Sequence, residues 1–301
     1  MKFTLRFSFL LGVIVVGLFI CCKNNSNDKE TILKGGTTIL VDETLKPIIE
    51  DQIAVFESDY KASIVLDARS EKEAALAFVK DTSRIIVMSR ELDEDEKKYF
   101  KSLNISPKTT KIGTDAIAFI TNKKSNDTLI SLEDVVGFLK GSSTAIKGLV
   151  FDNPNSSTVR FMSELSGLSS MPDKGIYSFK RNEDVVKFVS ENNGMIGVVG
   201  LNWLYQPNDS IKKHLKKINV VSVKGIGQNQ FYAPTQNNMA EGTYPLARDL
   251  FIINCQGYSG LGMGFASFVA GERGQRIILK SGLLPVRVPG RKILIMKNEK
   301  K

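Results

Sequence analysis

Three short segments of the chain place hydroxyl and acidic side chains where an apolar run gives way to a helical pattern. They are Asp42-Glu43-Thr44-Leu45, Asp67-Ala68-Arg69-Ser70 and Asn155-Ser156-Ser157-Thr158. The first turn of a helix exposes unpaired backbone N–H groups and the positive end of the helix dipole, so a hydroxyl there helps to hold an anion. Each segment alone is explained as well by an ordinary N-cap. Their recurrence favours one shared anion site at the carboxyl ends of the strands.

Alternating strand and helix patterns would position these segments. Apolar runs predict strands at 37–41, 62–66 and 83–88, and apolar residues at helical spacing predict helices at 47–60 and 71–79. Asp93 and Glu96 form a capping pair that opens a helix through Leu103. Strands that alternate with helices in this way predict a parallel α/β sheet.

A second α/β unit follows the first. Its pattern predicts strands at 116–121 and 194–199, a helix opened by Ser131 that runs through Leu139, and a helix capped by Asn182 that runs through Val189. The remaining pattern predicts a long strand at 245–254 and a last substantial helix at 265–279. The chain therefore has enough pattern and length for two core-forming lobes.

Residues that many enzymes and metal sites need are scarce. His214 is the only histidine and lies in a Lys-rich stretch, and Cys255 is the only cysteine outside the adjacent pair Cys21 and Cys22. A zinc site, or a hydrolase with a histidine base, would lack the side chains it needs. We expect no enzymatic activity, no cofactor and no metal site. The net charge of +9 is spread along the chain without a basic run, so no nucleic-acid partner is expected either.

The first 21 residues have the pattern of a signal peptide. Lys2 and Arg6 precede an apolar stretch at 7–20, which is short for a membrane span. The stretch ends in the two adjacent cysteines and resembles a lipoprotein signal, in which Cys22 is preferred over Cys21 as the lipidated residue because a small residue precedes it. Residues 22–34 would then be a polar tether to a membrane, in the periplasm or at the cell surface. An uncleaved anchor is the alternative, and 291–301 reads as a basic tail.

The order of the motifs resembles the substrate-binding proteins of phosphate ABC transporters. The resemblance covers about residues 35–288 and rests on Thr44-Leu45, Ser70, Ile85-Ile-Val-Met-Ser-Arg90-Glu-Leu, Gly113-Thr-Asp-Ala-Ile-Ala-Phe, Ser131-Leu-Glu-Asp-Val, Asn155-Ser-Ser-Thr158, Gly194-Met-Ile-Gly-Val and Tyr244-Pro-Leu-Ala-Arg-Asp-Leu. It implies the α/β, two-lobed periplasmic-binding-protein fold, type II-like, in which each lobe is a mostly parallel sheet flanked by helices and hinge strands join the lobes. We accordingly expect lobe 1 at 35–112 plus 246–290 and lobe 2 at 113–245.

The resemblance also implies which residues contact the ligand. They are Thr44, Leu45, Ser70 and the turn Ser156-Ser157-Thr158, in which Ser157 stands where the family typically has glycine. A serine fits that turn only if the backbone φ there is negative.

The charged positions depart from the family. Its members place an acid after the serine of the third strand and an arginine shortly before the Ser-Gly-Thr turn, whereas this chain has Arg90 and Asp152 there. We predict that the charges are exchanged between the lobes, so that Arg90 contacts the ligand and Asp152 faces it across the cleft. Alternatively, Arg90 pairs with Glu91 or Glu94 in solvent.

A carboxylate in the cleft would separate phosphate, which keeps a proton at neutral pH, from sulfate, which does not. Asp152, Asp67 and Glu43 are the candidates. The resemblance thus implies a monomeric, extracytoplasmic lipoprotein that captures inorganic phosphate for the permease of an ABC importer. The alternatives are a binder of sulfate or molybdate, a phosphate sensor, and a surface lipoprotein that uses the fold for protein contacts. The last predicts that the hydroxyls of Thr44, Ser70 and Ser156 do not converge.

Overall fold

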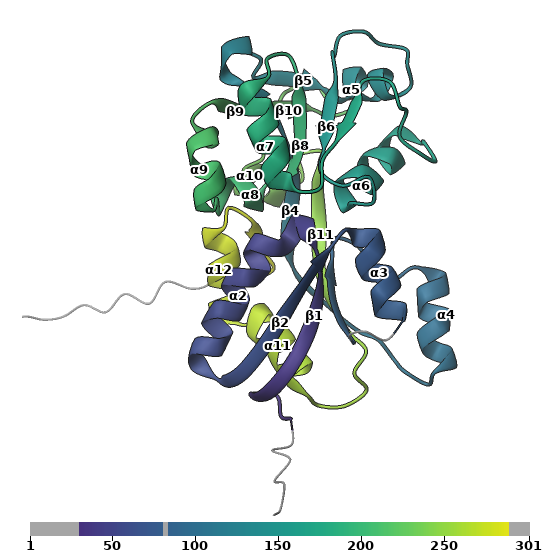
Figure 1. Ribbon diagram of the computed structural model, residues 1–301, viewed down its shortest axis with the longest axis vertical. Helices are drawn as coiled ribbons and strands as arrows, with labels where there is room; N and C mark the ends of the chain where they lie inside the picture. The colour runs from purple at the N-terminus through teal and green to yellow at the C-terminus, as the bar shows by residue number, and fades with distance from the viewer. Residues whose placement is uncertain (1–29, 81–83, 289–301) are drawn as a thin grey trace, which may run out of the picture. The chain divides into compact units, whose positions relative to one another are not determined.

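The structure is a computed structural model that describes residues 30–80 and 84–288 (Figure 1). From Thr31 onward these residues belong to one compact unit. The predicted signal peptide, both candidate lipidation sites, Cys21 and Cys22, most of the tether and the basic tail lie outside the described residues. No helix in the described part of the chain is both long and apolar enough to cross a membrane.

Lobe 1, as we use the name, is built on one end of a mixed sheet. Its strands lie in the order β2 (Lys61–Arg69), β1 (Lys34–Asp42), β3 (Ile85–Met88), β11 (Ala247–Asn254) and β4 (Lys108–Asn122). β1 is parallel to β2 and β3, whereas β11 is antiparallel to β3 and β4. The helical elements of this lobe are η1 (Glu43–Leu45), α2 (Lys46–Asp59), α3 (Glu71–Val79), α4 (Glu94–Ser102), α11 (Leu261–Ala270) and α12 (Glu272–Lys280), and β12 (Leu284–Pro285) pairs with β4.

Lobe 2 is built on the other end of the same sheet. Its order is β4, β8 (Ile196–Gly200), β6 (Leu149–Phe151) and β7 (Ile176–Ser178), with β9 (Ile218–Val220) also on β4 and a separate parallel pair formed by β5 (Leu129–Ser131) and β10 (Ser222–Lys224). The helical elements are η2 (Lys123–Ser125), α5 (Leu132–Leu139), α6 (Ser157–Ser166), α7 (Asn182–Glu191), α8 (Asn202–Tyr205), α9 (Asp209–Leu215) and α10 (Gln236–Ala240).

The long strand β4 joins the two lobes, together with the start of β11 (Figure 1). β4 pairs with β11 up to Ala116 and then with β8 from Ile117 onward. The Tyr244 hydroxyl donates to the Ile117 carbonyl at 2.7 Å and closes this crossing point. The predicted α/β two-lobed fold is therefore confirmed, while the residue boundaries assigned to the lobes remain a prediction.

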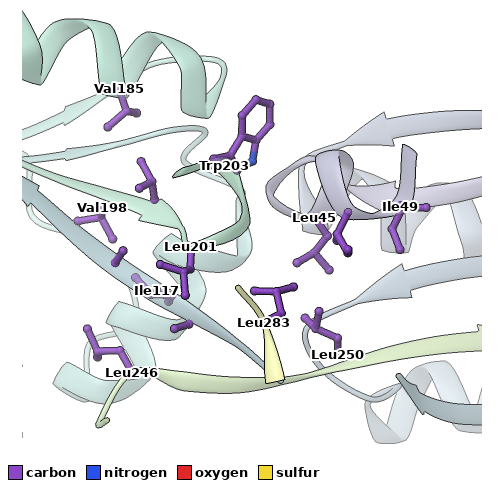
Figure 2. Close-up of a cluster of buried hydrophobic side chains, with 14 of the residues drawn as sticks. Leu45, Ile49, Ile117, Val185, Val198, Leu201, Trp203, Leu246, Leu250 and Leu283 are labelled. Atoms are coloured by element: carbon purple, nitrogen blue, oxygen red, sulfur yellow. The ribbon is translucent and has the colours of Figure 1, made fainter. Parts of the chain in front are cut away.

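Buried apolar side chains from both lobes meet behind this crossing. Figure 2 shows Leu45 and Ile49 on one side, Leu201 and Trp203 on the other, and Leu283 between them. These side chains are at most 3% exposed. They pack closely and exclude water, and so they fix the position of the polar residues at the start of η1. The backbone there is held as well, since the Trp203 Nε1 donates to the Thr44 carbonyl at 2.9 Å.

Local signals in the sequence explain most helix boundaries. Asp93 accepts from the backbone N–H groups of Asp95 and Glu96, and Glu96 returns a bond to the Asp93 N–H, so the predicted capping box is confirmed. The expected single helix at 265–279 is wrong in its extent. α11 already begins at Leu261, and Gly271, with an extended backbone, separates it from α12.

Candidate functional site

The start of η1 in lobe 1 and the start of α6 in lobe 2 meet through their hydroxyl groups. The Thr44 Oγ1 lies 3.0 Å from the Ser157 Oγ. The Asp42 carboxylate accepts from the Thr44 N–H at 3.2 Å, from the Thr44 hydroxyl at 2.9 Å and from the Ser157 hydroxyl. Donors from both lobes therefore converge on one negatively charged group.

A buried arginine completes this group. The Nη1 of Arg248 donates to the Ser157 Oγ at 2.7 Å, and its Nη2 and Nε donate to the Asp115 Oδ2 at 2.9 and 3.2 Å. We call Asp42, Thr44, Asp115, Ser157 and Arg248 the central cluster. All five residues are at most 5% exposed, so their interactions act in a low-dielectric environment.

A second polar group lies beside the central cluster. The Asp152 Oδ1 accepts from the Ser156 and Thr158 hydroxyls at 2.6 and 2.7 Å, and its Oδ2 accepts from the Asn182 Nδ2 at 3.0 Å. The same Asn182 amide also donates to the Glu43 Oε2 of lobe 1 at 2.9 Å. The prediction that Asn182 caps α7 is wrong, because Arg181 holds the N-cap position and the Asn182 side chain points to these two carboxyl groups.

The start of α3 also lies against the start of α6. The Lys72 backbone N–H donates to the Asn155 carbonyl at 3.1 Å, and Arg160 binds both oxygens of Glu71. Glu71 is 3% exposed. The Ser70 hydroxyl donates to the Glu73 carboxylate at 2.6 Å and forms a capping box at the start of α3. Ser70, which was predicted to contact the ligand, therefore caps its own helix in this structure. All three predicted helix starts therefore converge between the lobes.

The remaining predicted site residues occupy different places. Leu45 packs in the core, with its side chain fully buried. Arg90 forms a two-point contact with Glu96, at 2.7 and 2.9 Å, and its Nε lies 3.6 Å from the Glu71 Oε1. No hydrogen bond or ion pair joins Arg90 to Asp152 in the described part of the chain. Asp67 pairs with Arg69 at the half-exposed end of β2.

The carboxyl groups between the lobes outnumber the cations beside them. Burial, with Glu71 adding a like charge, raises the pKa of Asp42 to about 7 against the lowering effect of Arg248. Burial and the neighbouring Asp152 raise the pKa of Glu43 to about 8. Burial likewise raises the pKa of Asp115 and of Asp152. Near neutral pH Asp42 and Glu43 therefore hold protons to an extent that a surface carboxyl group would not.

Sequence reasoning missed Arg248, Asp115 and Asp42. Arg248 and Asp115 are direct partners in the antiparallel pairing of β11 with β4, and each is a charged residue at a buried position of its strand. Opposite charges in two such strands were the available signal. The substitution of serine for glycine at 157 carries no strain, since Ser157 is the first residue of α6 and is absent from the positive-φ positions.

The donor set suits an anion rather than a metal ion. In residues 30–80 and 84–288, no three His, Cys, Asp or Glu side chains are arranged to hold a metal ion. The hydrogen-bond donors that converge beside these carboxyl groups are hydroxyls, backbone N–H groups and a guanidinium, which bind oxyanions by charge-assisted hydrogen bonds.

Comparison with known proteins agrees with this description of the fold. The family model described as PBP superfamily domain matches residues 27–273. A comparison with curated protein sequences finds no match.

Three solved structures are similar to the chain over most of its length. A phosphate ABC transporter substrate-binding protein with bound phosphate from Clostridium perfringens is 20% identical, with a TM-score of 0.68, and the match covers 84% of this chain and 100% of that chain. An ABC-type phosphate transport receptor from Vibrio cholerae is 17% identical, with a TM-score of 0.59 and coverage of 83% and 99%. PstS from Borrelia burgdorferi is 20% identical, with a TM-score of 0.51 and coverage of 85% and 100%. At these identities the likeness establishes the fold.

Proposed function

Because the chain belongs to the family described as PBP superfamily domain, we propose that it is an extracytoplasmic solute-binding lipoprotein that captures inorganic phosphate between its lobes for an ABC importer. Its role is to bind, and no bond is made or broken. The similar structures from Clostridium perfringens and Vibrio cholerae, which carry phosphate transport in their descriptions, support this choice of ligand.

One observation carries the proposal. The Thr44 hydroxyl and N–H from lobe 1 and the Ser157 hydroxyl from lobe 2 donate to the same carboxylate, and Arg248 donates to Ser157 from the side. A group of donors that stabilises a carboxylate is also suited to a tetrahedral oxyanion. A rival role in protein contacts predicted that the hydroxyls of Thr44, Ser70 and Ser156 do not converge. The contact between the Thr44 and Ser157 hydroxyls argues against that role, while the Ser70 and Ser156 hydroxyls bind Glu73 and Asp152.

Binding in this position requires the lobes to open and close. The hydrogen-bonding groups of the central cluster bind one another in this structure. An oxyanion must therefore replace the contacts that Thr44 and Ser157 make to each other and to Asp42. β4 and the start of β11 form the connection about which such a motion would occur. The closed form would be the one that the permease recognises, because its surface contains both lobes in a fixed arrangement.

The excess of carboxyl groups favours an anion that carries protons. When Asp42 is ionised it can accept the proton of phosphate, whereas sulfate would set two unprotonated negative groups against each other. Burial, Glu71 and Asp152 raise the pKa of Asp42, while Arg248 and Ser157 lower it. In this assignment Asp42 takes the discriminating role for which Asp152, Asp67 and Glu43 were predicted, and Arg248 supplies the cation nearest the ligand. Arg90 remains a predicted contact.

Membrane attachment is the remaining part of the proposal. It depends on the sequence before Lys23, where Cys22 follows an apolar stretch. Palmitate labelling of the expressed full chain tests it. Label should be lost in Cys22→Ser and kept in Cys21→Ser, and equal labelling of the Cys22→Ser protein would refute lipidation at this residue.

Calorimetric titration of the purified protein with phosphate, sulfate and molybdate tests the ligand. We expect one phosphate per chain and much weaker binding of the other two anions. Ser157→Ala should weaken phosphate binding by about 10- to 100-fold, because it removes a hydrogen bond to a charged group worth about 1.5–3 kcal/mol. Ser58→Ala, at an exposed position of α2, is the control and should change nothing. If sulfate or molybdate binds more tightly than phosphate, that anion and not phosphate is the ligand. If no oxyanion binds, the proposed function is wrong.

A further inference from the structure

A large cavity lies next to the central cluster. Its volume is about 1100 Å³, and its walls come from α3 and α4 of lobe 1 and from α6 and the segment 168–178 of lobe 2. Ser156 and Glu71 stand in its inner wall. Ser156 is adjacent in the chain to Ser157 of the central cluster, and Glu71 is close enough to Asp42 to raise its pKa. The cavity and the proposed oxyanion site therefore share a boundary.

The size of the cavity fits an organic molecule. Sites for small organic ligands typically enclose about 300–1000 Å³ and combine apolar walls with a few polar groups. Ala75, Leu76 and Val79 line one wall from α3, and Leu168 and Met171 line the opposite one. Leu76 is 53% exposed, although it lies on a helix whose other apolar residues are mostly buried. Carbon groups of a ligand would cover this side chain.

The charges of the cavity indicate the kind of organic group. Its wall carries four basic and six acidic side chains in a chain whose net charge is +9. Within this wall, Arg160 is shared by Glu71 and Glu164, and Arg90 is shared by Glu96 and Glu71. Three carboxylates thus face two guanidinium groups. A ligand whose outer part is positively charged would balance the difference, whereas a second anionic group would add to it.

An aromatic ring in the same wall suits a cation. Tyr99 of α4 lines the cavity, and its ring is held by an edge contact with Phe100, with the ring centroids 5.3 Å apart. An alkylammonium group within about 6 Å of such a ring is attracted by the negative face of the ring.

We infer that the ligand is a zwitterionic phosphate ester whose phosphoryl group is held by the central cluster, while its ammonium-bearing carbon body lies in the cavity between α3, α4 and α6. This inference rests on the proposed function. Among phosphate-containing ligands, it makes an organic phosphate, and not free phosphate, the preferred one. Asp42 and Ser157 would contact the phosphoryl oxygens. Glu164 and Tyr99 would contact the ammonium group, and they belong to no part of the phosphate site.

Titration with four probes tests the inference: inorganic phosphate, phosphocholine, glycerol 2-phosphate and choline. Phosphocholine should compete with phosphate and bind at least about tenfold more tightly than glycerol 2-phosphate, which has the same charged group on a neutral body. Glu164→Gln and Tyr99→Leu should each weaken phosphocholine binding about three- to tenfold and leave phosphate binding unchanged. Glu272→Gln is the matched control, because Glu272 also pairs with an arginine four residues away on an exposed helix.

The outcomes separate the two proposals. Phosphate binding together with phosphocholine binding no tighter than glycerol 2-phosphate would overturn the inference and leave the proposed function in place. Choline binding as tightly as phosphocholine would also overturn it, since the phosphoryl group would then be unused. Binding of phosphocholine but not of phosphate, with loss in Ser157→Ala, would support the inference and remove inorganic phosphate as the ligand.

Discussion

Replacing Arg248 by methionine is expected to abolish phosphate binding and to lower the free energy of unfolding by about 3–5 kcal/mol. The substitution removes the guanidinium that donates to Ser157 and Asp115. Asp115 is fully buried; Arg248 donates to its Oδ2, and its Oδ1 has no hydrogen-bond partner among the described residues. Its charge would be left uncompensated in a low-dielectric environment. Urea denaturation and calorimetry measure the two effects.

A double variant separates binding from stability. Asp115→Leu/Arg248→Met replaces the buried pair by apolar side chains, which is often close to neutral for stability. We expect it to recover most of the lost stability and none of the phosphate binding. Arg69→Met is the control, because Arg69 pairs with Asp67 in a half-exposed position where such pairs contribute about 0–1 kcal/mol. Phosphate binding by the double variant at wild-type affinity would show that Arg248 only supports the fold.

Asp42→Asn is expected to reverse the preference between phosphate and sulfate. The amide keeps the shape of the side chain but can donate a hydrogen bond to either anion, so sulfate binding should strengthen and phosphate binding should weaken by about tenfold or more. Asp67→Asn, at the matching end of the neighbouring strand β2, should leave both affinities unchanged. Equal selectivity in wild type and Asp42→Asn, measured by competition titration, would rule out this role.

The same residue makes selectivity depend on pH. Because the pKa of Asp42 is raised to about 7, its carboxyl group is largely protonated at pH 6 and largely ionised at pH 8. Protonated Asp42 can donate to sulfate, so wild-type protein should discriminate against sulfate more strongly at pH 8 than at pH 6. Ionised Asp42 accepts the proton that phosphate itself carries, so the affinity for phosphate should change less than the affinity for sulfate between pH 6 and pH 8. Asp42→Asn should lose most of this dependence.

Local sequence signals were enough to predict the helix starts that converge in the site. Thr44, Ser70 and Ser156 each follow an apolar strand, and their spacing along alternating strands and helices implies one edge of a sheet. The Asp93–Glu96 capping box and the bounds of α3 needed only neighbouring residues. Such features depend on contacts within one turn of helix, so the linear sequence contains them.

The charged centre could not be predicted in the same way. Arg248 reads as an ordinary polar residue near the start of a strand, and only its register opposite Asp115 turns it into a buried ion pair. Asn182 has the composition of a helix cap, but Glu43 of the other lobe and Asp152 compete for its amide. Gly271 separates two helices whose apolar pattern runs on across the break. These outcomes depend on residues far apart in the chain, and propensity alone does not decide them.

A bound phosphate analogue would show directly where the protein holds an oxyanion. Arsenate has the shape and charge of phosphate, and the anomalous scattering of arsenic locates it in a crystal of the protein. We expect one strong peak within hydrogen-bond distance of the Thr44 and Ser157 hydroxyls and of the Arg248 guanidinium. A peak elsewhere on the protein, or none at saturating arsenate, would rule out the proposed site.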